Sequence, residues 1–222
     1  MKIRAIVPAW NEEATVADTV QPLVESGMFD MVLVVDDGST DRTAAATCAQ
    51  GACEIGAAVL TLTPNRGKGG AMLEAVTRAL ADGCEAIAFF DADLRGLRAE
   101  HARWLVDPVA DGRCVMCCGL RDYGPLINEM ARGWPPITGE RCVRADVLRA
   151  VPPAMWDGYK IEVGLNETAR TIGETYLVVL DGLQIVGKTE KFGRHEGFVR
   201  LARMSREVLI AWRDVREELK RG

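Results

Sequence analysis

Two aspartates, Asp91 and Asp93, follow an apolar run in the segment FFDADLRG (residues 89–96). One small residue separates them, so in an extended segment both carboxylates point to the same side. Two like charges this close cost free energy unless a positive group lies between them. A hard divalent cation is one such group, because Mg²⁺ is usually held by one or two carboxylates together with substrate phosphates. On its own, D-x-D fits a solvated turn with an aspartate helix cap equally well.

Two further motifs could hold a nucleotide. GKGG (residues 67–70) stands at the entry to a predicted helix, where free backbone N–H groups and Lys68 suit a diphosphate. It is not a P-loop, and no G-x-G-x-x-G follows the first predicted strand, which argues against a nicotinamide site. DDGS (residues 36–39) could hold a ribose or base edge, or be an ordinary turn and cap.

The elements that position these motifs alternate between strand and helix. Strands are predicted at residues 2–9, 31–37, 57–62 and 86–90, with helices opening at 11–13 and 40–41 and a third at 71–83. The strands are apolar throughout, which is typical of a parallel sheet covered by helices on both faces. The motifs at 8–13, 36–39, 65–68 and 91–93 all follow strand ends, so we expect them to meet in one crevice.

The second half is less regular. We expect a strand at 114–120, a loop-rich stretch at 124–142, a helix at 158–173 and two short strands within 175–188. Apolar residues then recur every three or four positions from 198 to 222, which predicts an amphipathic helix. These are Phe198, Leu201, Met204, Val208, Trp212, Val215 and Leu219.

Composition narrows the class of protein. The chain has 222 residues, 48% hydrophobic and 27% charged, as in a soluble globular domain. A net charge of -5 argues against a nucleic-acid binder, and no apolar run approaches the roughly 18 residues of a membrane span. The N-terminus does not read as a signal peptide, so we expect a cytoplasmic protein whose seven cysteines are reduced. CVMCC (residues 114–118) has C-x-x-C spacing, but a buried strand is favoured over a zinc or redox site.

Four pieces in this order and spacing carry a resemblance: VPAWNEEATV, VVDDGSTDRT, NRGKGGAM and FFDADL. They resemble the nucleotide-sugar half of GT-A-fold glycosyltransferases of the family 2 type, over about residues 3–95. ITGERCVRADVL (137–148) and DGYKIEVGLNETA (157–169) are similar to the acceptor half of glucosyl-3-phosphoglycerate synthases and their bacterial relatives. This chain is shorter than those synthases usually are.

The resemblance implies an α/β fold of the GT-A (Rossmann-like) kind, with a mostly parallel sheet flanked by helices and an amphipathic C-terminal helix. The length of the chain, with no internal repeat or clear linker, predicts one domain over residues 1–222. The nucleotide-sugar half would take about 1–95, the acceptor half about 96–197, and the C-terminal helix 198–222.

The resemblance also assigns residues to the donor site. Pro8, Ala9, Trp10 and Glu12 would line the nucleoside pocket, Asp37 would lie near the base or ribose, Lys68 would touch the diphosphate, and Asp91 would face the ribose or sugar. Asp93, with Asp91, would bind Mg²⁺ or Mn²⁺. In the synthases a histidine completes the metal site. Alignment on Gly193 and Phe198 places Thr189 there, and Glu190 or His195 are the substitutes to consider.

The reaction implied is metal-dependent transfer of a sugar from a nucleotide sugar, with UDP favoured over GDP. The acceptor would be a small phosphorylated or carboxylated molecule or a polyprenyl phosphate. The metal and Lys68 would stabilise the leaving nucleoside diphosphate. An inverting enzyme needs a base, for which Glu140 and Glu162 are candidates, whereas a retaining one can dispense with it. Arg141 and Arg144 could pair with an anionic acceptor.

Two other classes stay open. A nucleotidyltransferase that makes a nucleotide sugar also uses an α/β sheet with paired acids, although PAWNEEA stands where its glycine-rich loop would be. A degenerate GT-A domain would bind nucleotide without catalysis, and the missing histidine favours it. The C-terminal helix could lie on an anionic membrane or, as we favour, pack on its own domain or on a second subunit in a homodimer.

Overall fold

The computed structural model describes residues 1–131, 136–158, 160–185, 210 and 213–214. Its main sheet has seven strands in the order β3-β2-β1-β4-β7-β6-β8. They are β1 (Ile3–Ala9), β2 (Met31–Asp36), β3 (Ala57–Thr61), β4 (Ala86–Phe89), β6 (Met116–Arg121), β7 (Arg141–Arg144) and β8 (Thr175–Leu180). The short strands β5 (Leu94–Arg95) and β9 (Gln184–Ile185) pair separately.

The helices alternate with these strands along the chain. They are α1 (Val16–Glu25), α2 (Thr43–Thr47), α3 (Ala52–Ile55), α4 (Gly67–Ala81), α5 (Ala99–Ala110), α6 (Pro125–Ala131), α7 (Ala145–Ala150) and α8 (Lys160–Ile172), with 3-10 turns η1 (Ala49–Gly51) and η2 (Pro153–Met155). None of the described helices is long and apolar enough to cross a bilayer.

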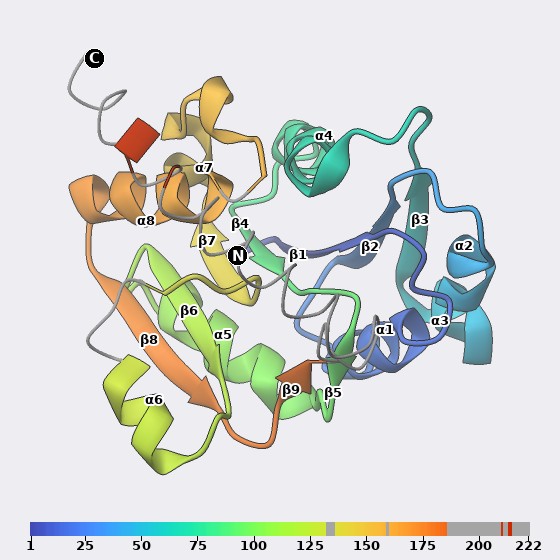
Figure 1. Ribbon diagram of the computed structural model, residues 1–222, viewed down its shortest axis with the longest axis horizontal. Coiled ribbons are helices and arrows are strands. Elements are labelled where there is room, and N and C mark those ends of the chain that lie inside the picture. Colours follow the sequence, from blue (N-terminus) through green and yellow to red (C-terminus); the bar gives the residue numbers. More distant parts are fainter. Residues whose placement is uncertain (132–135, 159, 186–209, 211–212, 215–222) are drawn as a thin grey trace.

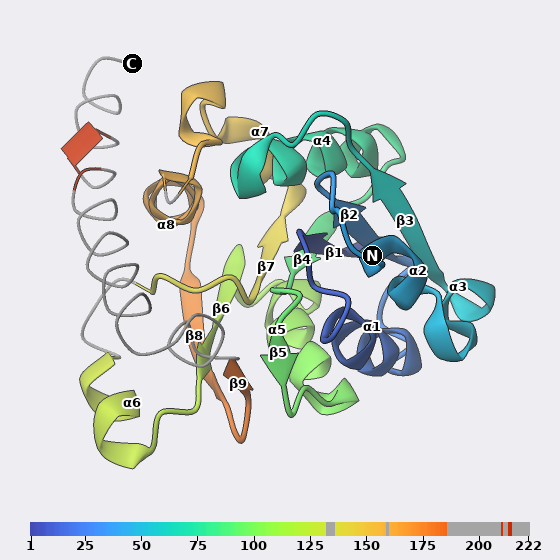
Figure 2. The ribbon, with the colours of Figure 1, turned by 45° about the vertical axis from the view of Figure 1, so that its right-hand side comes forward.

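Helices cover both faces of the sheet, which makes three layers (Figures 1 and 2). Alternate residues of each strand enter opposite cores, as a two-sided strand requires. In β4, Phe89 packs with α4, α7 and α8, whereas Ala88 packs with α1 and α5. The strands are therefore apolar throughout because helices bury both faces of the sheet, as predicted.

The α/β prediction is confirmed, with β1 to β4 parallel and each at its predicted place. Several boundaries differ. Helix α4 begins at Gly67 and not at residue 71, so GKGG is its first turn. Helix α5 was not predicted, and the stretch expected to be loop-rich contains α6 and β7. The predicted C-terminal helix (198–222) lies outside the described residues except at 210 and 213–214.

The cysteine prediction is wrong for two of the seven. Cys48 and Cys53 form a disulfide, with Cα atoms 4.9 Å apart. The other five are free and buried. Cys117 and Cys118 lie in β6, and Cys114 is buried just before that strand, which confirms a buried strand from residue 116 on. Burial raises the pKa of the Cys117 and Cys118 thiols.

At the opposite edge of the sheet from the sequence motifs, Arg4 secures the start of β1. Its guanidinium contacts Asp30 at 2.8 Å and Asp82 at 2.5 Å, and its side chain is 6% exposed. We expect Arg4→Met to lower Tm by about 4 °C, since both carboxylates lose a partner but stay near solvent, which screens them. Arg78→Met is the control, because Arg78 pairs on an exposed helix face with Glu74, and it should move Tm by less than about 1 °C. Equal shifts in thermal unfolding of the two variants would contradict the expectation.

Candidate active site

Strand register brings three distant segments to one edge of the sheet. β7 runs antiparallel to both neighbours, and Arg141 at its start lies opposite Phe89 of β4 and Cys118 of β6. The end of β4, the start of β7 and the end of β6 therefore meet. Asp91, Glu140 and Arg121 lie just beyond these points, at the carboxyl edge where open α/β sheets bind ligands.

These residues form the centre of a charge cluster. Arg121 Nη2 lies 2.5 Å from Asp91 Oδ2 and 2.9 Å from Glu140 Oε1. Glu140 is completely buried, and its second oxygen accepts a hydrogen bond of 2.6 Å from Thr138 Oγ1. One arginine thus holds together two carboxylates that would otherwise repel each other.

Two helices complete the cluster. Lys68, in the first turn of α4, lies 2.8 Å from Asp91 Oδ1 and 3.4 Å from Glu162 Oε1 in the first turn of α8. Gly69 allows this arrangement, since a Cβ there would stand 2.6 Å from the carbonyl oxygen of Trp156. The charge cluster, defined as Lys68, Asp91, Arg121, Glu140 and Glu162, therefore draws on five separate segments of the chain.

Mutual pairing sets the protonation of the charge cluster. Burial opposes ionisation of Asp91, but Lys68 and Arg121 lower its pKa to about 2. Burial alone would lower the pKa of Lys68, but Asp91 and Glu162 raise it above its ordinary value. Burial and the charge of Asp91 raise the pKa of Glu140, against the opposing effect of Arg121.

Some polar atoms of the charge cluster lack hydrogen-bond partners. It holds three carboxylates and two cations, and Glu162 Oε2 and Arg121 Nε are buried without a hydrogen-bond partner. Buried polar atoms in folded proteins are nearly always paired, so unpaired ones need an explanation. A ligand that carries hydroxyl groups would supply partners for a carboxylate oxygen such as Glu162 Oε2.

A second polar network lies beyond β1 and β2. The N–H of Asn11 donates to Ser39 Oγ at 2.9 Å, the N–H of Thr40 to Asn11 Oδ1 at 2.8 Å, and the N–H of Glu12 to Thr43 Oγ1 at 2.9 Å. Asn11 has φ of 54°, a left-handed conformation that asparagine tolerates better than most residues. We name residues 11–13 and 39–43 the paired loops.

The predicted nucleoside residues lie beside the paired loops. Pro8 and Ala9 end β1 opposite Val35 and Asp36 of β2, and Trp10 is 56% exposed. Glu12 accepts a hydrogen bond from the hydroxyl of Thr15. Asp37, which is 3% exposed, accepts the backbone N–H of Arg66 at 2.7 Å and so ties β2 to the turn before α4. Pro8, Ala9, Trp10, Glu12 and Asp37 thus stand together at the ends of β1 and β2, and β1 pairs with the strand β4 that leads to Asp91.

Asp93 lies two residues beyond Asp91 and is half-buried. Both oxygens of Asp91 are engaged by Lys68 and Arg121, so a cation at Asp91 would have to share them with these two side chains. No group of three or more metal-ligating side chains occurs among the described residues. A Mg²⁺ ion fits this donor set nonetheless, because it commonly takes one or two carboxylates and completes its shell with phosphates and water. The other suggested ligands, Glu190 and His195, lie outside the described residues, as does Thr189.

The acceptor expectation for the two arginines needs correction. Arg141 is 1% exposed and donates inward to the carbonyl of Thr138 and the side chain of Asn166. Arg144 ends β7 at the opposite edge of the sheet and pairs with Asp146. Arg141 thus braces the site internally, and Arg144 is remote from it.

Arg121 is the residue that sequence reasoning missed. It follows an apolar strand, as the acidic motifs do, and that position was the available signal. However, whether the strand ends at the same edge as β4 depends on the sheet order, which the local pattern does not contain. Thr138 was missed for a simpler reason, because it lies in a stretch expected to be loop.

Gly139 is required for the close approach of two strand ends. A Cβ at this position would overlap the carboxylate of Asp91, which Lys68 and Arg121 hold in place. We expect Gly139→Ala to displace Asp91 and lower kcat about 100-fold, in line with the loss of a well-aligned catalytic group. Gly112→Ala is the control for a glycine substitution away from the site. Nothing lies within 4 Å of its Cβ position, and its φ of 73° strains an alanine, so we expect lower stability but an unchanged kcat. Steady-state rates within threefold of wild type for Gly139→Ala would contradict this.

The sheet order and its helical layers are those of an α/β protein of the GT-A fold, with polar residues gathered at the carboxyl edge. Residues 5–148 match the family model described as glycosyl transferase family 2. The chain belongs to that family and is a glycosyltransferase.

Known relatives agree with this membership. The glucosyl-3-phosphoglycerate synthase of Mycobacterium tuberculosis (strain CDC 1551 / Oshkosh) is 29% identical over 243 residues, which cover 93% of this chain and 71% of the relative. The 4,4'-diaponeurosporenoate glycosyltransferase of Staphylococcus aureus is 32% identical over 102 residues, 46% of this chain and 26% of the relative. The crystal structure of the M. tuberculosis synthase with Mn²⁺, UDP and phosphoglyceric acid superposes with a TM-score of 0.75 at 25% identity, covering 96% of this chain and 78% of that one.

Proposed function

We propose that this protein transfers a sugar from a UDP-sugar to a small phosphorylated or carboxylated acceptor, with a divalent cation at Asp93. The observation that carries the proposal is the charge cluster at the carboxyl edge of the sheet, where Lys68 and Arg121 hold Asp91 beside a buried and unpartnered oxygen of Glu162. The choice of UDP and of Mn²⁺ or Mg²⁺ is supported by the similar synthase structures, which were solved with these groups. A polyprenyl phosphate is the other acceptor to screen.

The donor would lie along the carboxyl edge. Its base and ribose would occupy the region of the paired loops, between Trp10 and Asp37. The exposed ring of Trp10 offers a face for a base, and base–aromatic stacking contributes about 1–3 kcal/mol. The diphosphate would then reach the first turn of α4, where Lys68 and the helix N-terminus favour negative charge.

The sugar would lie over the charge cluster. Asp91 and Glu162 present carboxylate oxygens that accept hydrogen bonds from sugar hydroxyls, and Arg121 keeps Asp91 and Glu140 in a fixed arrangement. A bound cation would neutralise charge on the leaving diphosphate. Lys68 would stabilise the same charge from the protein side as the glycosidic bond breaks.

The choice between inversion and retention depends on a base. Glu140 is completely buried and bound by Arg121 and Thr138, so it is better suited to bracing the cluster than to taking a proton from an acceptor. Glu162 keeps one unpartnered oxygen and is therefore the better candidate base if the reaction inverts.

Thermal unfolding with UDP, GDP, CDP and UTP, each with and without Mn²⁺ or Mg²⁺, tests the donor site. A ligand at 100 times its Kd adds about 2.7 kcal/mol, or several degrees of Tm for a chain of this length. We expect a metal-dependent rise with UDP that Asp93→Asn abolishes. Asp107→Asn is the matched control, because Asp107 is an exposed carboxylate on α5, and it should leave the rise intact.

The same experiment can fail in a defined way. If no nucleotide shifts Tm with either metal, the donor proposal is wrong and the aspartates only form a turn. If UDP binds, UDP-sugars should next be screened against phosphorylated, carboxylated and polyprenyl-phosphate acceptors. Release of pyrophosphate from UTP and a sugar phosphate would instead favour a nucleotidyltransferase.

A further inference from the structure

The two cysteines of the disulfide are more exposed to solvent than the other five cysteines. Cys48 is exposed and Cys53 is half-buried, whereas the five free cysteines are all buried. Burial raises the pKa of each free thiol, which suppresses the reactive thiolate. Cys48 and Cys53 are therefore the cysteines of this chain that are not buried.

The disulfide closes a short segment of irregular helix. It joins the end of α2 to α3 across η1, and the two cysteines are five positions apart in sequence. Helices α2 and α3 have five and four residues, lengths at which an isolated helix does not persist in water. Their order depends on packing and on the covalent link.

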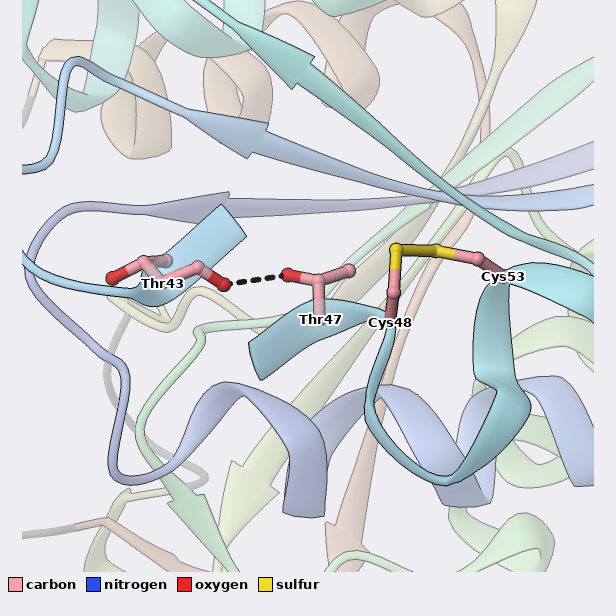
Figure 3. The surroundings of a disulfide bond; sticks show 4 residues. All are labelled: Thr43, Thr47, Cys48 and Cys53. Carbon is pink, nitrogen blue, oxygen red and sulfur yellow. Dashed lines mark hydrogen bonds between the residues drawn. A yellow bond between two sulfur atoms is a disulfide. The ribbon is translucent and has the colours of Figure 1, made fainter. Parts of the chain in front are cut away.

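Helix α2 is in turn bonded to the paired loops. Thr47 Oγ1 donates to the carbonyl of Thr43 at 3.1 Å, immediately beside the disulfide (Figure 3). Thr43 Oγ1 accepts the N–H of Glu12 at 2.9 Å, and both threonines are completely buried. The N–H of Arg42, next to the start of α2, donates to the carboxylate of Glu13 at 3.0 Å. A continuous chain of contacts thus runs from the disulfide to the paired loops.

We propose that Cys48 and Cys53 form a thiol–disulfide exchange site whose reduction loosens α2 and the paired loops. Its effect on donor affinity rests on the donor site proposed above. A ligand that binds ordered loops must supply the free energy to order them when they are loose, so its affinity falls. The disulfide form is the one with the higher affinity for UDP.

The exchange needs a dithiol as co-reactant. One thiolate of the dithiol attacks Sγ of Cys48, the more exposed of the two residues, and a mixed disulfide forms. The Cys48–Cys53 bond breaks, and Cys53 leaves as a thiolate that takes up a proton. The second thiolate of the dithiol then attacks the first sulfur of the same dithiol, which is bonded to Cys48. Cys48 is released as a thiolate and takes up a proton. Two electrons pass to the protein, and the dithiol becomes a cyclic disulfide.

The first test measures the site without relying on function. The native protein, before and after dithiothreitol, is alkylated with iodoacetamide and mapped by peptide mass, and amide hydrogen exchange is followed in parallel. We expect reduction to expose Cys48 and Cys53 to alkylation while the five buried cysteines stay protected. The amides of Glu12 and Arg42 should exchange about tenfold faster after reduction. Unlinked cysteines in the oxidised protein, or unchanged exchange in the paired loops, would overturn the proposal.

The second test is the Kd of UDP by calorimetry in both redox states. Reduction should raise the Kd about threefold to tenfold. The double variant Cys48→Ser/Cys53→Ser should show the weaker Kd in both states, and Cys114→Ala, which keeps the pair, should respond like wild type. Equal Kd values in the two states of wild type would overturn the link to the donor site. If UDP binds neither state but exchange still accelerates, the exchange site stands and the donor proposal fails.

Discussion

Lys68→Met is expected to lower kcat about 100- to 1,000-fold, the usual cost of removing one preorganised group that meets charge in the transition state. Lys68 is the cation at the first turn of α4, and no backbone N–H can replace its full charge beside the leaving diphosphate. In the free protein it also holds Asp91 and Glu162 together, at 2.8 and 3.4 Å. Loss of Lys68 therefore removes a positive charge and also the contacts that hold Asp91 and Glu162 in position. KM for the donor should rise by less than kcat falls.

Two further variants separate charge from alignment. Lys68→Arg keeps the charge and should recover at least a tenth of the lost rate, because a guanidinium can still reach Asp91. Lys2→Met removes a lysine at the opposite edge of the sheet, where Lys2 contacts Asp30, and should leave kcat within twofold. The measurement is steady-state release of UDP from the donor found in the acceptor screen. A Lys68→Met rate within threefold of wild type would show that α4 does not contact the diphosphate.

The first half of the fold was predictable because its signals are local. Each of β1 to β4 is a short apolar run that ends in a polar motif, and parallel strands place all such ends at one edge. Position within a strand then sufficed to bring Asp37, Lys68 and Asp91 towards the same side of the molecule. The family resemblance added the nucleoside residues, which local patterns do not distinguish from a turn.

The second half was less predictable because its geometry is not local. β7 has four residues and runs against its neighbours, and its register alone brings Glu140 and Arg121 beside Asp91. Arg141, taken for an acceptor ligand, faces inward because the start of β7 is buried. The start of α4 was predicted four residues too late. Gly67 was expected to lie in a loop, but with a φ of 74° it is the first residue of the helix.

The disulfide could not be inferred from composition. An odd number of cysteines predicts at least one free thiol, and a separation of five residues is not diagnostic of a disulfide. Only the turn between α2 and α3 brings the Cα atoms of Cys48 and Cys53 to 4.9 Å, within the range that a disulfide requires.

Arg121→Met is expected to have the largest effect on stability of any single change in the charge cluster. Arg121 is 14% exposed, and its loss leaves the completely buried Glu140 without its cation and Asp91 with Lys68 alone. Breaking a buried ion pair by removing one partner costs about 3 kcal/mol or more. For a chain of 222 residues this corresponds to a fall in Tm of about 6–12 °C. Arg113→Met, which removes an exposed pair with Asp111, is the control and should change Tm by less than about 1 °C.

The fall in Tm caused by Arg121→Met should be larger at high pH than at low pH. The pKa of Glu140 already lies above its ordinary 4.5, owing to burial and to Asp91, so this group favours the fold most below pH 4.5 and less as pH rises through its folded value. Removing Arg121 raises that pKa further. Asp91, whose pKa is lowered to about 2, favours the fold above pH 3.8, and it loses part of that contribution without Arg121. The loss at Asp91 is the same at pH 5 and pH 8, since both lie above 3.8, whereas the change at Glu140 penalises the variant more at pH 8 than at pH 5. The Tm difference from wild type should therefore narrow as pH falls. A difference that is constant, or that widens at pH 5, would mean that Arg121 acts through packing of its side chain and not through the two carboxylates.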